Sequence, residues 1–415
     1  MIRPTVFAPL GLLVLSPWAH AKELPKAPPA AVGLSAEKLS AIKPTLQKLV
    51  DQEKLAGGVA LVARHGKVAY LEPFGYRDLA TKAPMTADTI FAIASMTKPV
   101  TCVAAMMLVE EGKLSLDDPV GKYLPELSEL RVLGDRKDDL GDKVATVPAR
   151  RPVSIRHLLA HASGIAYGGI LSTNARLRTV YEGAGVQDRR LKTIAEQVAR
   201  LATVPLAHQP GEGWTYGLSH DVLGRVAEVV SGERFDQYLQ THLFAPLDMR
   251  DTGFRVPEDK RERVATLYRA ELAGGLTPLP KNYGTETFFS GGGGLFSTAR
   301  DYSRFAQMLL NGGELDGVRL LKPETITTMT TNQIGKHNAL FLFKYGLGFG
   351  LEMTRTPGDR TPRLNRYFWG GVFSTYFFID PRQELVGILM TQVIPTNSSG
   401  AEREFRRVVD TAIEN

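Results

Sequence analysis

Apolar and polar positions recur along the chain with different periods, and these periods predict its elements. From Leu34 to Leu49 apolar residues return at helical spacing between charged ones, which predicts an amphipathic surface helix. Residues 57–78 hold two strand-like runs around His65-Gly66, which predicts a hairpin. Residues 95–111 are apolar on nearly all sides, which predicts a buried helix.

The rest of the chain separates into a helical middle and a strand-rich end. Residues 115–290 have a turn-rich, helical pattern, in which the charged stretch 131–151 is expected to be an exposed loop. Residues 367–393 read as two or three strands. Strands at both ends of a helical middle predict an α/β sheet domain interrupted by a helical insertion. The expected segments are a signal peptide (1–21), a sheet domain (22–98 and 291–415) and a mostly helical domain (99–290), with the active site between the two domains.

The first 21 residues have the pattern of a secretory signal. Arg3 gives a basic start, Val6 to Leu15 form an apolar stretch, and Ala19-His20-Ala21 is a small-x-small cleavage site. This stretch is too short for a membrane helix, and no later run approaches the necessary ~20 apolar residues. A single cysteine, Cys102, permits no intrachain disulfide. We therefore expect a protein without a membrane span, exported to the periplasm or secreted.

Composition excludes few functions. With 415 residues, 43% hydrophobic and 23% charged, the chain resembles an ordinary globular enzyme. Its formal net charge of +6 could suggest a nucleic-acid partner, but basic residues are scattered among acidic ones without a basic stripe. We expect a small-molecule substrate and no nucleic-acid partner.

One serine and lysine pair stands in unusual surroundings. The spacing Ser-x-x-Lys occurs three times, at Ser35/Lys38, Ser40/Lys43 and Ser95/Lys98. The first two lie on the amphipathic helix, where Ser35 is expected to be the N-cap and Ser40 a surface residue. The third lies in the first turn of a buried helix, where a lysine needs a reason to be tolerated.

In that first turn the pair could perform chemistry. The positive end of the helix dipole favours negative charge developing on Ser95, and Lys98, one turn on, can reach its hydroxyl. Desolvation and the dipole both disfavour the ammonium form of Lys98, which predicts a base or a group that shares a proton. Tyr216, after a Pro-Gly-Glu turn, could take the serine proton and return it to a leaving group.

Trp369-Gly370-Gly371-Val372 adds glycines within a strand-like run. Glycines in a strand often let another backbone or a ligand approach closely, which suits an edge strand whose N–H faces a substrate carbonyl.

In this order, these features resemble the serine β-lactamase and penicillin-binding-protein superfamily. The segments that carry the likeness, from about Gly33 to about residue 410, are SMTK, EEGKLSLDDPVGKYLPEL, IRHLLAHASG, PGEGWTYG, SGGGGLFSTARDYSRF and WGGVFSTYFFIDP. The nearest likeness is to the class C β-lactamase-like branch and, within it, to family VIII carboxylesterases. The resemblance implies an α/β fold of the β-lactamase/transpeptidase type: an antiparallel sheet flanked by helices, plus the inserted helical domain.

The resemblance also implies roles for individual residues. Ser95 is the acylated nucleophile, Lys98 its activating partner and Tyr216 the general base. The N–H groups of Ser95 and Val372 form the oxyanion hole. It implies neither a cofactor nor a metal.

Two departures from the family pattern concern the substrate, which we expect to contact Leu218, Trp369, Gly370 and Gly371. Leu218 stands where β-lactamases usually have asparagine, and Trp369 stands where they usually have the lysine that faces a substrate carboxylate. Arg366 could replace that lysine, but strand alternation puts it on the opposite face. An apolar wall suits uncharged groups. We therefore expect a serine carboxylesterase for short-chain, uncharged esters with weak or no β-lactamase activity.

Other interpretations stay open. A class C-type β-lactamase or D-alanyl-D-alanine peptidase would use the same serine, and a catalytically silent penicillin-binding protein would keep the fold alone. An acyltransferase would share the intermediate. His157 and His161 have a spacing that can bind zinc, but no glutamate lies between them and no third ligand is evident, so a structural role is expected. Cys102 is expected to be a packing residue.

Overall fold

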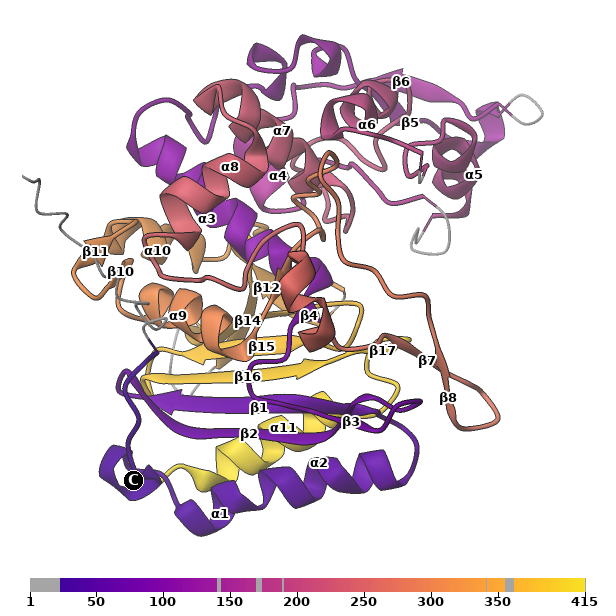
Figure 1. Cartoon of the computed structure of the whole chain (residues 1–415). Helices are drawn as coiled ribbons and strands as arrows, with labels where there is room; N and C mark the ends of the chain where they lie inside the picture. Colours follow the sequence, from indigo (N-terminus) through magenta and orange to yellow (C-terminus); the bar gives the residue numbers. More distant parts are fainter. Residues whose placement is uncertain are drawn as a thin grey trace, which may run out of the picture.

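The centre of the molecule is an eight-stranded sheet (Figure 1). The computed structural model describes residues 23–139, 143–168, 174–188, 190–340, 342–354 and 362–414, so the expected signal peptide lies outside the described residues. The strand order is β12-β13-β14-β15-β16-β1-β2-β3, and every neighbouring pair is antiparallel. The expected antiparallel α/β fold is confirmed.

The sheet is assembled from both ends of the chain. Its strands are β1 (Gly57–Arg64), β2 (Lys67–Asp78), β3 (Ala83–Pro84), β12 (Lys344–Tyr345), β13 (Gly350–Thr354), β14 (Arg363–Gly370), β15 (Tyr376–Asp380) and β16 (Leu385–Thr391). The predicted hairpin is confirmed, since β1 and β2 turn at His65 and Gly66, which both have positive φ. β1 is buried at every position because helices cover both faces of the sheet.

Helices from the two chain ends pack together on one face of the sheet. They are α1 (Ala36–Ser40), α2 (Ile42–Asp51) and α11 (Ala401–Ala412), seen below the sheet in Figure 1. The single helix predicted over 34–49 is thus two short ones, and Ser35 caps the first by accepting a hydrogen bond from the Lys38 N–H. On the other face α9 (Ala299–Leu310) packs against β1 and β16.

The middle of the chain forms a mostly helical region above this second face. Its helices are α4 (Ile155–Leu159), α5 (Ala175–Gly183), α6 (Ile194–Leu201), α7 (Ser219–Ser231) and α8 (Phe235–Leu239). The buried helix α3 (Thr97–Glu110) runs from the sheet into this region and packs against α7 (Figure 1). Every residue of α3 from Thr97 to Leu108 is buried, which agrees with its all-round apolar pattern.

Two details differ from the sequence predictions. The charged stretch expected as a loop contains a hairpin, β5 (Arg131–Leu133) and β6 (Thr146–Pro148), which forms because Val132 is buried and bridges to Leu206. The strand β14 is not at an edge but lies between β13 and β15. Its pairing with β13 stops at Phe368, however, so its last two residues pair with β15 alone.

Smaller elements complete the chain. Short strands are β4 (Phe91–Ala92), β7 (Tyr268–Ala270), β8 (Leu276–Pro278), β9 (Phe296–Ser297), β10 (Glu314–Leu315), β11 (Val318–Arg319) and β17 (Val393–Ile394), and the remaining α-helix is α10 (Pro323–Met329). β7 and β8, from the stretch assigned to the helical domain, form a small sheet with β17 from the sheet domain. The domain bounds stay a prediction. Within the described ranges, no helix has the length and apolar character needed to cross a membrane.

Candidate active site

Ser95 lies in a short 3-10 turn, η2 (Ala94–Met96), that leads into α3. The turn is held from the side by a neighbouring segment, because the Ile93 N–H donates to the Leu295 carbonyl at 3.0 Å. Ala94 has a φ of 44°, so the chain bends sharply just before the serine. Ser95 is half-buried and lines a cavity of about 1110 Å³.

Lys98 is fully buried one turn after Ser95. Its Nζ donates to Ser95 Oγ at 3.2 Å, to the Tyr167 hydroxyl at 3.0 Å and to the Gly292 carbonyl at 2.6 Å. Three acceptors match the three N–H bonds of an ammonium group. This geometry is compatible with a protonated lysine that contacts the serine.

The structure adds neighbours of Lys98 that the sequence prediction of a base or proton-sharing group did not include. Burial does act to lower the pKa of Lys98, as expected, but Tyr167, Tyr216 and Asp221 act in the opposite direction and the net pKa lies above its usual range. The polar groups that outweigh desolvation come from distant parts of the chain, which local sequence could not show. These neighbours therefore favour the ammonium form of Lys98 beside the serine.

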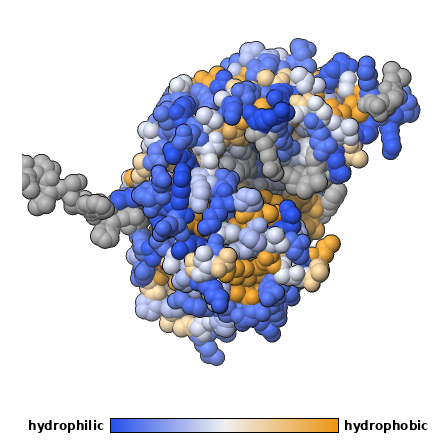
Figure 2. All heavy atoms as spheres, turned by 45° about the vertical axis from the view of Figure 1, so that its right-hand side comes forward, coloured by the Kyte–Doolittle hydropathy of each residue, from blue (hydrophilic) through white to orange (hydrophobic). Residues whose placement is uncertain are grey.

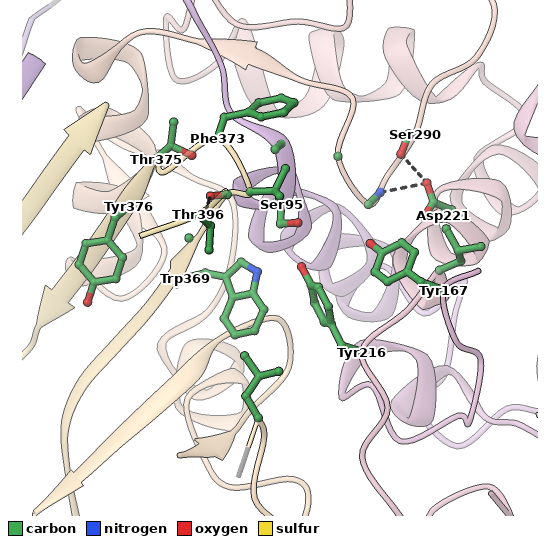
Figure 3. Close-up of a pocket in the computed structure, with 18 of the residues that line it drawn as sticks. Ser95, Tyr167, Tyr216, Asp221, Ser290, Trp369, Phe373, Thr375, Tyr376 and Thr396 are labelled. Carbon is green, nitrogen blue, oxygen red and sulfur yellow. Dashed lines mark hydrogen bonds between the residues drawn. The ribbon is translucent and has the colours of Figure 1, made fainter. Parts of the chain in front are cut away.

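Tyr216 completes the group of residues expected from sequence. Lys98 Nζ lies 4.7 Å from the centre of its ring, and Figure 3 shows its hydroxyl pointing toward Ser95. The next residue, Gly217, fixes this position because a Cβ there would lie 2.1 Å from the Ile165 carbonyl oxygen. The structure therefore brings Ser95, Lys98 and Tyr216 together.

Sequence reasoning missed two residues beside Lys98. Tyr167 is buried and accepts a hydrogen bond from Lys98, and burial raises the pKa of its phenol. No spacing pattern could have found it, since 69 residues separate the pair. Asp221 is buried in α7 and accepts hydrogen bonds from Ser290 and Gly292 (Figure 3). The sequence carried no clear signal for Asp221, since its helix also has charged residues at Arg225 and Glu228.

The turn after β14 brings the Val372 backbone to the cavity that Ser95 lines. A Cβ on Gly371 would lie 2.5 Å from the Ile93 carbonyl oxygen, so the close backbone approach that the glycines predicted is present. Thr375 Oγ1 donates to the same carbonyl at 3.2 Å. Ile93 is two residues before Ser95, so these contacts fix the turn and the serine relative to each other. An oxyanion hole made by Ser95 and Val372 stays a prediction that this arrangement suits.

Leu218 and Trp369 both line the cavity and are only 4% and 5% exposed. The Trp369 ring lies edge-on to Tyr345, with 5.1 Å between ring centroids. Arg366 is on the opposite face of β14, as alternation predicts, where it pairs with Asp380 at 3.1 Å and with Asp410 at 2.5 Å. Apolar side chains gather in the hollowed middle of the face drawn in Figure 2.

The two histidines with zinc-like spacing are tied into the fold. His157 Nδ1 accepts from the Ser154 N–H at 3.1 Å in a capping box, whereas His161 packs against other rings. Cys102 is buried with its Sγ 3.1 Å from His220 Nε2, and burial raises the pKa of its thiol. Over the described ranges, no three His, Cys, Asp or Glu side chains gather as metal ligands would.

Comparison with known proteins places the chain in a family. The family model described as Beta-lactamase matches residues 42–411. "Protein Rv1367c" of Mycobacterium tuberculosis is 37% identical over 376 residues, 86% of this chain and 90% of its own length. "Esterase EstB" of Burkholderia gladioli is 31% identical over 399 residues, 90% of this chain and 95% of its own length.

Solved structures agree with the sequence relatives. The structure titled "EstCE1, a hydrolase with promiscuous acyltransferase activity" matches with a TM-score of 0.73 and 27% identity, and the match covers 90% of this chain and 98% of that one. The chain therefore belongs to the beta-lactamase family, in which it is a serine hydrolase similar to the family VIII esterases.

Proposed function

We propose that the protein is a carboxylesterase that hydrolyses short-chain, uncharged esters through an acyl-enzyme on Ser95. The observation that carries the proposal is the 3.2 Å hydrogen bond from buried Lys98 to Ser95, in a cavity walled by Leu218 and Trp369. A buried cation against a serine hydroxyl is the arrangement expected of an activated nucleophile. Apolar walls favour substrates without charge.

Each proton has a defined carrier in this reaction. Tyr216 acts as a phenolate that the neighbouring Lys98 ammonium stabilises. Ser95 Oγ attacks the ester carbonyl while its proton passes to this phenolate, which becomes a neutral phenol. The N–H groups of Ser95 and Val372 bind the oxyanion. When the carbon–oxygen bond to the leaving alcohol breaks, Tyr216 returns the proton to that oxygen. Water then attacks the acyl-enzyme by the reverse sequence and releases the acid and free Ser95.

The β-lactamase and peptidase alternatives require a partner for the substrate carboxylate. Trp369 occupies the position where the family usually has a lysine for that role. Arg366 is committed elsewhere, because Asp380 and Asp410 hold it on the opposite face of the strand. These features support esters over β-lactams.

Acyl transfer to an alcohol is a second candidate function. A cavity of about 1110 Å³ exceeds the ~300–1,000 Å³ of most small-molecule sites and leaves room for an acceptor beside a short acyl group. EstCE1 is described as a hydrolase with promiscuous acyltransferase activity. An alcohol in place of water would then resolve the same intermediate.

The test compares two serines that share the Ser-x-x-Lys spacing. Wild type, Ser95→Ala and the surface control Ser40→Ala are assayed with nitrophenyl esters of increasing chain length and with a chromogenic cephalosporin. We expect Ser95→Ala to lose ~10³-fold or more of the ester activity and Ser40→Ala to keep it. Cephalosporin turnover as fast as ester turnover would refute the substrate assignment. Ser95→Ala as active as wild type would refute the mechanism. A wild type with neither ester turnover nor a covalent adduct by mass spectrometry would identify a silent binding protein.

We also propose export through residues 1–21. Supporting it are the basic start, apolar stretch and small-x-small site of that segment. Expression in a bacterial host followed by fractionation and N-terminal sequencing should find a periplasmic chain that begins after Ala21.

A further inference from the structure

A buried carboxylate lies close to the Lys98 cation without touching it. Asp221 is 2% exposed and Lys98 is fully buried. Gly292 lies between them: its N–H donates to Asp221 Oδ1 at 3.2 Å, and its carbonyl accepts from Lys98 Nζ at 2.6 Å. In the part of the chain that the structure describes, no direct ion pair joins Lys98 and Asp221. One glycine therefore links an acid and a base through its own backbone.

The two hydrogen bonds of Asp221 are compatible with an ionised carboxylate. Its Oδ1 accepts from Ser290 Oγ at 2.5 Å and from the Gly292 N–H, and both partners are donors (Figure 3). Burial raises the net pKa of Asp221 above its usual value, although Ser290, Lys98 and the Gly292 N–H act to lower it. A buried carboxylate costs several kcal/mol unless a cation is near. Lys98 is that cation.

This pair accounts for Gly292 in the glycine run at 291–294. A Cβ on Gly292 would lie 2.4 Å from Asp221 Oδ2, and one on Gly291 would lie 2.3 Å from the His220 carbonyl oxygen. Neither glycine has a positive φ, so backbone conformation does not require them. Gly292 lacks a side chain because it lies between the two buried charged groups, whereas Gly291 is held close to the His220 backbone.

We infer that Asp221 is a positioning residue for acyl transfer, which acts through Gly292 to keep Lys98 an ammonium while Tyr216 exchanges the Ser95 proton. The inference rests on the proposed function. With Lys98 already protonated, the serine proton can pass to Tyr216 and from there to the leaving group. Without the Asp221 charge, the buried ammonium has only neutral acceptors and releases its proton more readily. A neutral lysine stabilises the Tyr216 phenolate less.

The titratable groups that surround Lys98 come from several elements, and all bear on its protonation. They are Tyr167, Tyr216 and Asp221, which favour the cation, and Cys102, His161 and His220, which Lys98 in turn affects. Burial lowers the pKa of both histidines well below the usual value, so they are neutral neighbours at ordinary pH. Asp221 is the single carboxylate in this group.

The test separates the charge of Asp221 from its hydrogen bonds. Asp221→Asn keeps the shape and loses the charge, whereas Ser290→Ala removes one hydrogen bond and keeps the charge. We expect Asp221→Asn to lower kcat ~10- to 100-fold and to change KM less than about threefold. In the pH profile of kcat/KM, the alkaline limb should move to lower pH by ~1 unit or more. The sign follows because activity needs protonated Lys98 and is lost as pH rises through its lowered pKa. Ser290→Ala should lower kcat less than Asp221→Asn does, and its alkaline limb should lie at the same pH as that of the wild type.

A second variant makes the test independent of the folding of Asp221→Asn. Gly292→Ala forces the carboxylate away and should move the same limb in the same direction by a smaller amount. Circular dichroism and thermal melting of each variant report folding. If the folded variants keep the wild-type alkaline limb, or if Ser290→Ala moves it as far as Asp221→Asn, the inference is wrong. A wild type with no ester activity would instead refute the proposed function.

Discussion

Two buried cations on opposite faces of the central sheet have very different neighbours. Lys98 donates to a serine, a tyrosine and a backbone carbonyl. Arg366 pairs directly with Asp380 and Asp410 and lies over the ring of Phe378. The guanidinium is fully committed, and it joins β14 to β15 and α11. The ammonium is held by neutral oxygens, one of which belongs to the candidate nucleophile.

The difference shows what distinguishes a structural cation from a reactive one. A carboxylate in direct contact neutralises a buried cation, so the hydrogen-bond donors of that cation are not available to a substrate. When the carboxylate is set back behind Gly292, the cation stays protonated and still acts on Ser95. Both cations are buried. They differ in where the carboxylate lies: in direct contact with Arg366, but behind Gly292 for Lys98.

The largest expected effect is on catalysis. Lys98→Met keeps the length of the side chain and removes the charge, so kcat/KM for a nitrophenyl ester should fall ~10³-fold or more. Its melting temperature should also fall, because the buried Asp221 loses its nearby cation. The fall should be smaller than that of Arg366→Met, which breaks direct ion pairs with two carboxylates. If Lys98→Met keeps its activity but melts at a lower temperature than Arg366→Met, Lys98 is the structural cation of the two.

The next effect is on stability. Arg366→Met leaves the buried Asp380 without its partner and should lower the free energy of unfolding by about 3 kcal/mol, measured by urea denaturation. The folded fraction should keep kcat/KM within about threefold. As a control, Lys43→Met breaks the exposed pair with Glu72 and should cost less than ~0.5 kcal/mol. Equal losses in the two variants would show that Arg366 has no special role in stability.

A third effect concerns the turn that faces Ser95. Gly371→Ala puts a Cβ within 2.5 Å of the Ile93 carbonyl oxygen and displaces the Val372 N–H, so kcat should fall ~10²-fold. The matched control is Gly183→Ala at the end of α5, where a Cβ meets nothing within 4 Å. That variant should keep wild-type kinetics. If Gly371→Ala keeps wild-type kcat, the assignment of Val372 to the oxyanion hole is wrong.

Local patterns sufficed for several elements of the fold. The hairpin at His65-Gly66, the cap at Ser35 and the buried helix after Ser95 depend on neighbours in sequence, so periodicity and residue type predicted them. The hairpin in 131–151 was missed because it depends on the burial of Val132 against a distant residue. The edge position expected for β14 failed for a similar reason, since β13 pairs with it only in the folded sheet.

For the site, the amino-acid order alone selected Ser95, Lys98 and Tyr216 and noted Trp369 and Leu218 as departures, because family motifs preserve spacing. Only the folded chain could show that Tyr167, Asp221 and Gly292 surround Lys98, since these contacts join α3 to residues 69 to 194 positions away. The charge state of Lys98 followed from them. Desolvation can be guessed from an apolar helix, but the acceptors and the carboxylate that oppose it are brought there by tertiary packing.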